Sequence, residues 1–228
     1  MTEINFSSLP LDPSLQQSLK DHHLEFCTPI QAESLPLLLK NQDCAGQAQT
    51  GTGKTLAFLL GCMQRLLSDS ENITLPGKPK VLILAPTREL ALQIHKDAEL
   101  LIGHNSLKLA LCYGGKAYEQ QKQQFERPVD ILIGTPGRLI DFFKQKLYTL
   151  KSAQCMVLDE ADRMFDMGFI NDVRYLLRRP PTTSPSSSAT CSARFRRSTS
   201  GMGPPRSRRA TPIWPPSRSD ATSSPSGG

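Results

Sequence analysis

A short segment near residue 50 combines glycines, a lysine and a hydroxyl at the spacing of a phosphate-binding loop. Its residues are Ala48, Gln49, Thr50, Gly51, Thr52, Gly53, Lys54 and Thr55. The glycines let backbone N–H groups turn towards phosphate oxygens, Lys54 can reach the outer phosphates, and Thr55 can offer its hydroxyl to Mg²⁺. The first position departs from the general pattern, which begins with glycine. The segment predicts binding of a nucleoside triphosphate with Mg²⁺, and the alternative is a glycine-rich surface turn.

Adjacent carboxylates follow an apolar run near residue 158. The run Val157-Leu158 leads directly into Asp159-Glu160-Ala161-Asp162. An isolated Asp-Glu pair favours a solvated acidic turn at a helix start. Because an apolar strand precedes this pair and the chain also has a phosphate-binding loop, we expect Asp159 to hold Mg²⁺ and Glu160 to orient the attacking water. The expected hydrolytic residues are Lys54, Thr55, Asp159 and Glu160, and the expected metal ligands are Thr55 and Asp159.

The elements that must position these residues follow from the hydrophobic pattern. Short apolar runs alternate with longer segments in which apolar residues recur every three or four positions. This alternation is typical of an α/β fold, a parallel sheet flanked by helices. The 228 residues are enough for one such domain but short for two. The apolar runs span 81–84, 109–112, 131–133 and 156–158, and the helical segments span 29–40, 55–67, 88–102, 116–125 and 138–144.

Each apolar run ends abruptly in a polar or glycine-rich segment. In an open α/β sheet, ligands bind outside the carboxyl ends of the strands, so these segments should gather along one edge. Thr135 is suited to cap a helix and Pro136 to begin it, which leaves backbone N–H groups and Arg138 facing an anion such as a nucleic-acid phosphate. Alone, this segment would favour an ordinary capped helix. The four segments are Pro86-Thr87-Arg88, Gly114-Gly115, Thr135-Pro136-Gly137-Arg138 and Asp159-Glu160-Ala161-Asp162.

Composition changes sharply after Arg179. Residues 180–228 contain 13 serines, 9 prolines, 7 arginines and one acid, and lack lysine, glutamate, leucine and valine. Subtracting the 7 arginines and one aspartate from the totals of 27 basic and 21 acidic residues leaves 20 of each in residues 1–179. The formal charge of +6 therefore belongs to the tail and indicates no nucleic-acid footprint on the folded part. We expect residues 180–228 to be disordered, and a shifted reading frame explains them better than a selected basic tail.

Cysteine usage and hydropathy bound the cellular setting. The six cysteines are widely spaced without a Cys-x-x-Cys pair, which favours thiols in a reducing cytosol over disulfides or zinc ligands. The chain does not open with a basic segment followed by an apolar stretch, and no window has the roughly 18 apolar residues that span a bilayer. We expect a cytoplasmic protein without membrane association. The cysteines are Cys27, Cys44, Cys62, Cys112, Cys155 and Cys191.

The acidic segment at residues 159–162 spells the box that gives the DEAD-box helicases their name, and other segments follow in that family's order. Residues 26–31, Phe-Cys-Thr-Pro-Ile-Gln, resemble its Q motif. Those at 85–90, 114–115 and 135–138 are similar to its RNA-backbone motifs. Residues 4–179 thus resemble the N-terminal RecA-like P-loop domain of the DEAD-box ATP-dependent RNA helicases. The resemblance implies ATP and Mg²⁺ as cofactors and RNA, bound largely independently of its sequence, as a partner.

The resemblance also implies roles for individual residues. The Gln31 amide would read the adenine edge and Phe6 would pack on the adenine ring, although Phe6 is nearly as well suited to the core. Asp162 would couple this domain to a second one. The expected ATP-binding residues are Phe6, Gln31 and all eight residues from Ala48 to Thr55. The expected RNA-binding residues are Pro86, Thr87, Arg88, Gly114, Gly115, Thr135, Pro136, Gly137 and Arg138.

The chain departs from the family pattern after the acidic box. The family continues to a strand ending in Ser-Ala-Thr and then to a second RecA-like domain, which supplies an arginine that stabilises the transferring phosphoryl group. Here Ser188-Ala189-Thr190 follows serines, and neither that strand nor that domain is recognisable. We therefore expect residues 1–179 to form one RecA-like domain of an RNA helicase that is deficient in unwinding. A catalytically silent ATP- or RNA-binding fragment and a nonfunctional gene remnant remain as alternatives.

Some stretches are especially similar to the branch of this family that belongs to the bacterial RNA degradosome. This closer resemblance implies degradosome components as partners and a part in RNA degradation. The stretches are residues 27–31, 46–55, 129–134 and 158–169.

Overall fold

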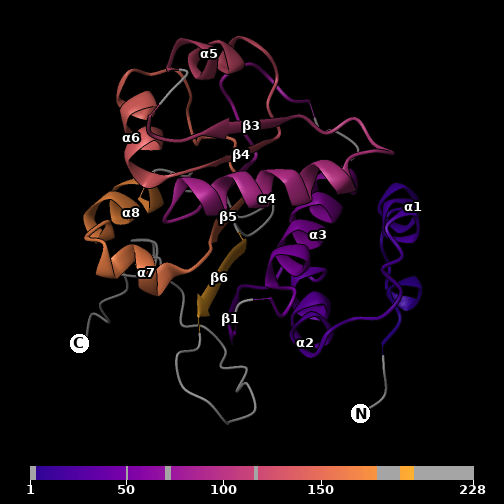
Figure 1. The fold of residues 1–228 in the computed structure, drawn as a ribbon. Coiled ribbons are helices and arrows are strands. Elements are labelled where there is room, and N and C mark those ends of the chain that lie inside the picture. Colours follow the sequence, from indigo (N-terminus) through magenta and orange to yellow (C-terminus); the bar gives the residue numbers. More distant parts are fainter. Residues whose placement is uncertain (1–3, 50, 70–72, 116–117, 179–190, 198–228) are drawn as a thin grey trace, which may run out of the picture.

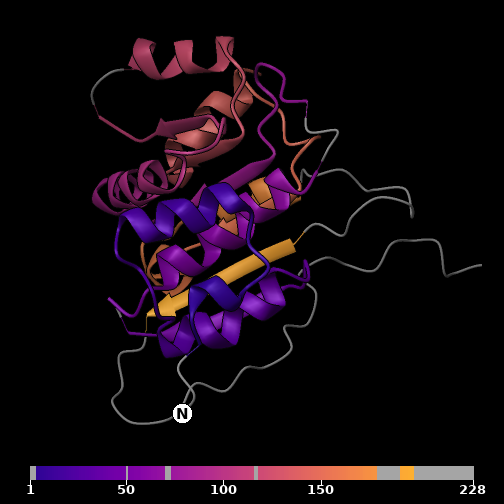
Figure 2. The same cartoon turned by 90° about the vertical axis from the view of Figure 1, so that its right-hand side faces the viewer.

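The computed structural model describes residues 4–49, 51–69, 73–115, 118–178 and 191–197, the last segment as backbone only. Its centre is a six-stranded sheet with the strand order β1-β6-β5-β2-β4-β3 (Figures 1 and 2). All neighbouring strands are parallel, and helices separate consecutive strands along the chain. The strands are β1 (Cys44–Ala48), β2 (Val81–Leu84), β3 (Leu109–Cys112), β4 (Ile131–Gly134), β5 (Cys155–Leu158) and β6 (Cys191–Arg197).

Helices cover both faces of the sheet. Val81 and Ile83 of β2 belong to one hydrophobic cluster with side chains of α1 to α4, whereas Leu82 and Leu84 belong to a second cluster with side chains of α6 to α8. This alternation follows from the pleat of a strand. The helices are α1 (Pro13–Asp21), α2 (Pro29–Leu38), α3 (Lys54–Leu67), α4 (Arg88–Leu101), α5 (Tyr118–Gln123), α6 (Pro136–Lys144), α7 (Ala161–Asp166) and α8 (Ile170–Leu177), with short 3₁₀ helices at Phe6–Ser8 and Gln124–Glu126.

The sequence-based elements are confirmed in the described residues. All four apolar runs are strands, and all five helical segments are helices whose described ends differ by one or two residues, with a 3₁₀ turn closing α5. Sequence reasoning missed β1, β6, α1, α7 and α8. The strand β1 was missed because Cys-Ala-Gly-Gln-Ala is neither strongly apolar nor β-branched.

A strand that the sequence did not reveal follows the acidic segment, within the tail for which we expect disorder. Cys191–Arg197 forms β6, which lies between β1 and β5 and pairs in parallel with both, from Cys44↔Ala193 to Ala48↔Arg197 and from Cys155↔Cys191 to Leu158↔Arg194. Figure 1 shows β6 between α7 and α3. The Ser-Ala-Thr triplet at 188–190 lies outside the described residues. The expected disorder elsewhere in residues 180–228 also concerns residues that the structure does not describe.

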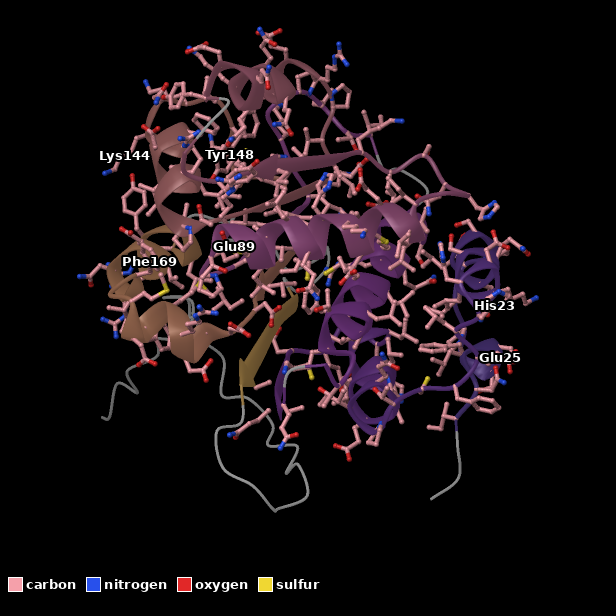
Figure 3. The ribbon with its side chains drawn as sticks, in the orientation of Figure 1. His23, Glu25, Glu89, Lys144, Tyr148 and Phe169 are labelled. Atoms are coloured by element: carbon pink, nitrogen blue, oxygen red, sulfur yellow. The ribbon has the colours of Figure 1, made fainter. Side chains whose placement is uncertain are left out.

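Aromatic side chains fill the core beneath α6. Tyr148, which Figure 3 labels below α5, is 3% exposed. It stacks on Phe125 at a centroid distance of 5.3 Å and donates a hydrogen bond from Oη to the Leu139 carbonyl. Phe142 meets the rings of Tyr118 and Phe125 edge to face. These contacts hold the first turns of α6 against the second face of the sheet.

In the part of the chain that the structure describes, no helix combines the length and apolar character needed to cross a membrane.

Candidate functional site

Two left-handed glycines shape the loop before α3. The φ angles are 81° at Gly51 and 86° at Gly53, a region that is costly for residues with a Cβ. A Cβ on Gly53 would stand 2.2 Å from Nε2 of Gln31, so this position has neither the conformation nor the space for another residue. The sequence-based requirement for glycine here therefore has a structural reason. Thr50 lies outside the described residues.

The Lys54 side chain lies inside this loop and binds two of its carbonyl groups. Its side chain is largely buried, and Nζ donates hydrogen bonds to the carbonyls of Ala48 (2.6 Å) and Gln49 (2.7 Å). A buried ammonium group needs such partners. These bonds hold the lysine where it can share an anion with the backbone N–H groups of α3.

The Gln31 side chain braces the same loop. It is 2% exposed, its Nε2 donates to the Gly53 carbonyl (3.0 Å), and its Oε1 accepts from the Thr28 N–H (2.8 Å). Thr28 in turn donates from Oγ1 to the Thr52 carbonyl (2.7 Å). The segment before α2 is therefore tied to the phosphate-binding loop by two side chains. Reading of an adenine edge by Gln31 stays a prediction.

Phe6 lies in the core, which was the alternative to stacking on adenine. Its side chain is 2% exposed, and its N–H donates to the Glu25 carbonyl (2.9 Å). The residue next to it, Asn5, forms an isolated bridge with Phe26. A ring covered in this way presents no open face to a base, so this arrangement gives the expected adenine contact no support. Stacking on adenine stays a prediction.

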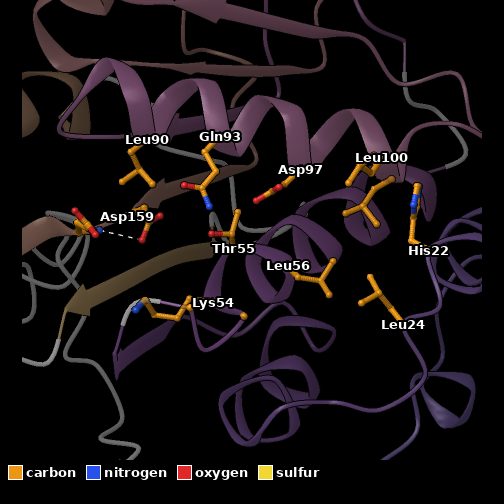
Figure 4. A pocket seen from close by; sticks show the side chains of 14 residues that line it. His22, Leu24, Lys54, Thr55, Leu56, Leu90, Gln93, Asp97, Leu100 and Asp159 are labelled. Carbon is orange, nitrogen blue, oxygen red and sulfur yellow. Dashed lines mark hydrogen bonds between the residues drawn. The ribbon is translucent and has the colours of Figure 1, made fainter. Parts of the chain in front are cut away.

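The carboxylates of Asp159 and Glu160 follow directly after β5. Asp159 is 3% exposed, and its Oδ1 accepts the Glu160 N–H (3.0 Å, Figure 4). The pKa of Asp159 is raised to about 6, chiefly by burial, which the charge of Lys54 opposes and the neighbouring Glu160 reinforces. The opposing lysine is the one from the phosphate-binding loop, so the two halves of the predicted hydrolytic site lie within electrostatic reach of each other.

Glu160 has an unusual backbone. Its φ is 48° and ψ 48°, the left-handed region that few non-glycine residues adopt, and it immediately precedes α7. Its largely buried carboxylate forms an ion pair with Arg163 (3.3 Å). A strained, buried carboxylate at the end of a central strand is typical of a functional residue.

A cavity of about 310 Å³ joins the predicted catalytic groups (Figure 4). Its lining combines Gly51, Gly53, Lys54 and Thr55 with Asp159 and Glu160, which the sequence places more than a hundred residues apart. The glycine loop and the carboxylates therefore face one cavity, as the sequence predicts.

The cavity continues along α4 past residues that sequence reasoning missed. Gln93 and Asp97 line it together with Leu90 and Leu100, and the far end is closed by residues after α1 (Figure 4). Partial burial raises the pKa of Asp97. Positions 90, 93, 97 and 100 recur at helical spacing, so this stripe was visible in the sequence as one face of a helix. The further lining residues are His22, Leu24, Leu56 and Leu101.

The oxygen donors at this site suit Mg²⁺. Thr55 and Asp159 both line the cavity. Mg²⁺ usually takes one or two carboxylates, and phosphates and waters complete its shell. Among the described residues, no group of three or more His, Cys, Asp and Glu side chains could hold a metal ion. Binding of Mg²⁺ by Thr55 and Asp159 stays a prediction.

The polar segments after β5, β2, β4 and β3 lie side by side along one edge. Hydrogen bonds of 3.0 Å continue the sheet past the strand ends, from the Asp159 N–H to the Leu84 carbonyl and from the Ala85 N–H to the Gly134 carbonyl. A third, from the Thr135 N–H to the Cys112 carbonyl, completes the row. The single composite edge predicted from the sequence is therefore confirmed.

The start of α4 presents Arg88 to solvent. Thr87 caps the helix, because its side chain accepts from the Leu90 N–H, while Pro86 is buried beneath it. The Arg88 guanidinium carbon lies 5.0 Å from the centroid of the Tyr113 ring. Beyond that ring, the exposed residues Gly114 and Gly115 form the turn after β3, with φ 109° at Gly115.

The start of α6 holds Arg138 in a fixed place. Pro136 is the first residue of the helix, as predicted, and Gly137 is exposed. Thr135 is the N-cap residue, but its side chain makes no capping hydrogen bond among the described residues. The Arg138 guanidinium lies over the rings of Tyr118 (4.7 Å) and Phe142 (5.2 Å). The two helix starts and their arginines thus form a basic edge with open backbone N–H groups.

Asp162 lies in the first turn of α7, two residues after Glu160, and is partly buried. Coupling to a second domain stays a prediction.

A sequence profile described as "DEAD/DEAH box helicase" matches residues 28–198. The chain is 55% identical over 184 residues to the "ATP-dependent RNA helicase RhlB" of Idiomarina loihiensis. This match covers 81% of this chain and 43% of that protein. It is 54% identical over 182 residues to the protein of the same name from Vibrio parahaemolyticus, with 79% and 42% covered. The chain therefore spans about two fifths of the length of these curated relatives.

The fold is similar to the crystal structure of a DEAD box protein from the hyperthermophile Methanococcus jannaschii. The TM-score is 0.74 at 32% sequence identity, and the match covers 87% of this chain and 52% of that one. The matched sheet and helices form a RecA-like domain, as predicted.

Proposed function

Because the chain belongs to the DEAD/DEAH box helicase family, we propose that it forms the ATP-binding half of an ATP-dependent RNA helicase core. The observation that carries this proposal is the single cavity lined by Gly51, Gly53, Lys54, Thr55, Asp159 and Glu160. Its lining has the cationic loop, the hydroxyl and the buried carboxylates that phosphoryl transfer requires.

Each of these groups has a distinct part in the proposed reaction. The loop N–H groups and Lys54 bind the outer phosphates, and Thr55 and Asp159 hold Mg²⁺. When bound, Mg²⁺ neutralises charge on the phosphate oxygens. Glu160, which lines the same cavity, would orient the attacking water.

We assign the basic edge to RNA. The starts of α4 and α6 offer backbone N–H groups to phosphates, and Arg88 and Arg138 add charge-assisted contacts. These groups address the backbone of a nucleic acid and carry no information on base sequence. Binding should therefore depend strongly on salt and weakly on sequence.

We propose that the purified chain binds ATP and single-stranded RNA but does not separate a duplex, because in this family a second domain contributes to the phosphoryl-transfer site. A fluorescent ATP analogue titrated with Mg²⁺ tests the first part. Binding that is lost in Lys54→Ala supports the proposal, and equal binding by both proteins contradicts it.

A catalytically silent ATP- and RNA-binding module is the second candidate. The chain spans about two fifths of the length of its curated relatives, which favours a binding module for the isolated chain. Phosphate release that rises on addition of RNA at low salt would rule it out, provided that Glu160→Gln abolishes the release.

The cellular setting follows by family. We propose a cytoplasmic role in RNA degradation, with degradosome components as partners, because the resemblance over residues 158–169 and the curated relatives at about 55% identity point the same way. Co-purification of tagged chain with ribonuclease activity tests this. Recovery of the chain without any associated ribonuclease would count against it.

A further inference from the structure

We propose that Gln121, on α5, is a positioning residue of the basic edge: it holds Arg138 and the turn after β3 in one arrangement that suits an RNA backbone. Tyr113 acts in the same way on Arg88. This inference rests on the proposed RNA binding and adds two side chains that do not themselves bind phosphate.

Gln121 links two segments of the basic edge through one buried oxygen. The residue is 4% exposed, and its Oε1 accepts the Tyr113 N–H (2.9 Å) and a hydrogen bond from Arg138 Nη1 (3.3 Å). The first donor belongs to the turn after β3, and the second belongs to the first turn of α6. A buried amide oxygen that is shared by two segments fixes their spacing, because loss of both bonds would leave that oxygen unsatisfied.

The Arg138 side chain is held on its other sides by aromatic rings. Its guanidinium carbon lies 4.7 Å from the Tyr118 centroid and 5.2 Å from that of Phe142. Both α5 residues, Tyr118 and Gln121, therefore contact the same guanidinium group. A guanidinium has five donors, so a hydrogen bond to Gln121 leaves several for an anion. Holding the side chain in advance lowers the entropy lost on binding.

The same chain of contacts reaches Arg88. Tyr113, whose N–H is bound by Gln121, places its ring 5.0 Å from the Arg88 guanidinium carbon. Arg88 Nη1 also lies 3.7 Å from the place that a Cβ would take on Gly115. Arg88, Tyr113, Gln121 and Arg138 thus connect all three predicted RNA segments across the ends of β2, β3 and β4.

The neutral amide of Gln121 is important to this arrangement. A glutamate at position 121 would keep both acceptor contacts and the side-chain length, but it would place a carboxylate against Arg138. That carboxylate would compete with RNA phosphate for the guanidinium donors. A purely structural role for Gln121 predicts that this change, which also removes the amide donor, affects folding and not RNA binding, whereas a positioning role predicts weaker RNA binding by a folded protein.

The experiment measures binding of a fluorescein-labelled 12-nucleotide oligouridine to the full chain by anisotropy, at several salt concentrations. The variants are Gln121→Glu, Gln121→Met, Arg138→Ala and the double variant Gln121→Met/Arg138→Ala. We expect Arg138→Ala to weaken binding about tenfold and to lower the salt slope by about 0.7, one phosphate contact on a single strand. We expect about fivefold weakening from Gln121→Glu and from Gln121→Met, and a smaller further loss when Gln121→Met is added to Arg138→Ala, because only the contact of Gln121 with Tyr113 then remains to be lost.

Three outcomes separate the ways in which the proposal can fail. If Arg138→Ala leaves RNA binding unchanged, the proposed basic edge is wrong and the inference falls with it. If Arg138→Ala weakens binding but Gln121→Met weakens it equally with and without Arg138, Gln121 is structural and only the inference is overturned. The inference is also overturned if Gln121→Glu binds RNA as tightly as the parent chain. Binding of a fluorescent ATP analogue and the melting temperature serve as controls, and both should stay near the parent values in Gln121→Glu.

A matched pair tests Tyr113. Tyr113→Phe keeps the ring and should bind RNA within about twofold of the parent, whereas Tyr113→Leu should lose about threefold through Arg88. Equal binding by both variants would overturn the role assigned to this ring.

Discussion

The two ends of the functional edge are held together in different ways. At the RNA end, β2, β4 and β3 are adjacent, apolar strands whose carboxyl ends are joined by direct hydrogen bonds and braced by aromatic rings. At the nucleotide end, β1 leads into the glycine loop, and its only neighbour in the described sheet is β6. Within the described sheet, β6 is therefore the only strand that connects the glycine loop to β5, the strand that precedes Asp159. Contacts of α3 provide a second connection.

The composition of the strands sharpens this difference. The strand β5 reads Cys-Met-Val-Leu and is fully buried, whereas its neighbour β6 reads Cys-Ser-Ala-Arg-Phe-Arg-Arg. Strands inside a parallel sheet that is covered on both faces are usually apolar throughout. The comparison indicates that the RNA end is robust and that the nucleotide end depends on a strand of unusual composition.

The largest effect should come from removing β6. A chain that ends at Thr190 lacks the strand between β1 and β5, and we expect it to lose roughly 5 kcal/mol of unfolding free energy, much of what stabilises a domain of this size. Urea unfolding followed by circular dichroism measures this. A chain that ends at Ser198 is the control and should unfold like the full chain. Identical unfolding of both truncated chains would show that β6 does not hold the sheet together.

Replacement of Lys54 should have the next largest effect. Lys54→Ala removes a charge-assisted contact to phosphate and two hydrogen bonds that close the loop. We expect about 4 kcal/mol of lost nucleotide affinity, roughly a thousandfold, measured by titration calorimetry with an ATP analogue and Mg²⁺. Lys96→Ala, at an exposed position of α4, is the control. RNA binding should be unaffected. A parallel loss of RNA affinity would show that the nucleotide end and the RNA end of the edge do not act separately.

Substitution of the glycines compares the two ends directly. Gly53→Ala places a Cβ at φ 86° and 2.2 Å from Gln31 Nε2, so we expect about 3 kcal/mol of lost nucleotide affinity. Gly114→Ala, where nothing lies within 4 Å, should leave nucleotide affinity unchanged. The same titration reports both. Tolerance of alanine at Gly53 would show that the loop is not held as described.

The smallest expected effect concerns Asp159 and pH. Its pKa of about 6 in the folded chain lies above its ordinary value of 3.8, so the folded state binds this proton more tightly than the unfolded state does. Stability should therefore fall as pH rises from about 4 to 6, and Asp159→Asn should raise stability at pH 8 by about 2 kcal/mol. Mg²⁺-dependent nucleotide binding should weaken below pH 6, where the carboxylate is protonated. Urea unfolding at a series of pH values is the measurement, and equal pH profiles for both proteins would contradict the assignment.

Sequence reasoning succeeded where chemistry and hydrophobic pattern coincide. The four apolar runs and their polar ends predicted β2 to β5 and the composite edge, because those strands are both apolar and short. It failed at β6, since an arginine-rich segment has no apolar pattern to detect. Phe6 could not be placed, because a phenylalanine suits a core and a base-stacking site equally well. The partners of Gln31 and the lining stripe of α4 depend on how distant segments pack, which residue types alone do not specify.

Anomalous diffraction from crystals that contain Mn²⁺ in place of Mg²⁺ and a non-hydrolysable ATP analogue tests the central claim most directly. The claim is that the loop before α3 and the carboxylate after β5 converge on one metal-bound triphosphate. The account predicts one manganese peak between Thr55 Oγ1 and the Asp159 carboxylate, in contact with the outer phosphates and with Lys54 Nζ on the same triphosphate. A triphosphate bound elsewhere, or a metal that contacts neither Thr55 nor Asp159, would contradict it.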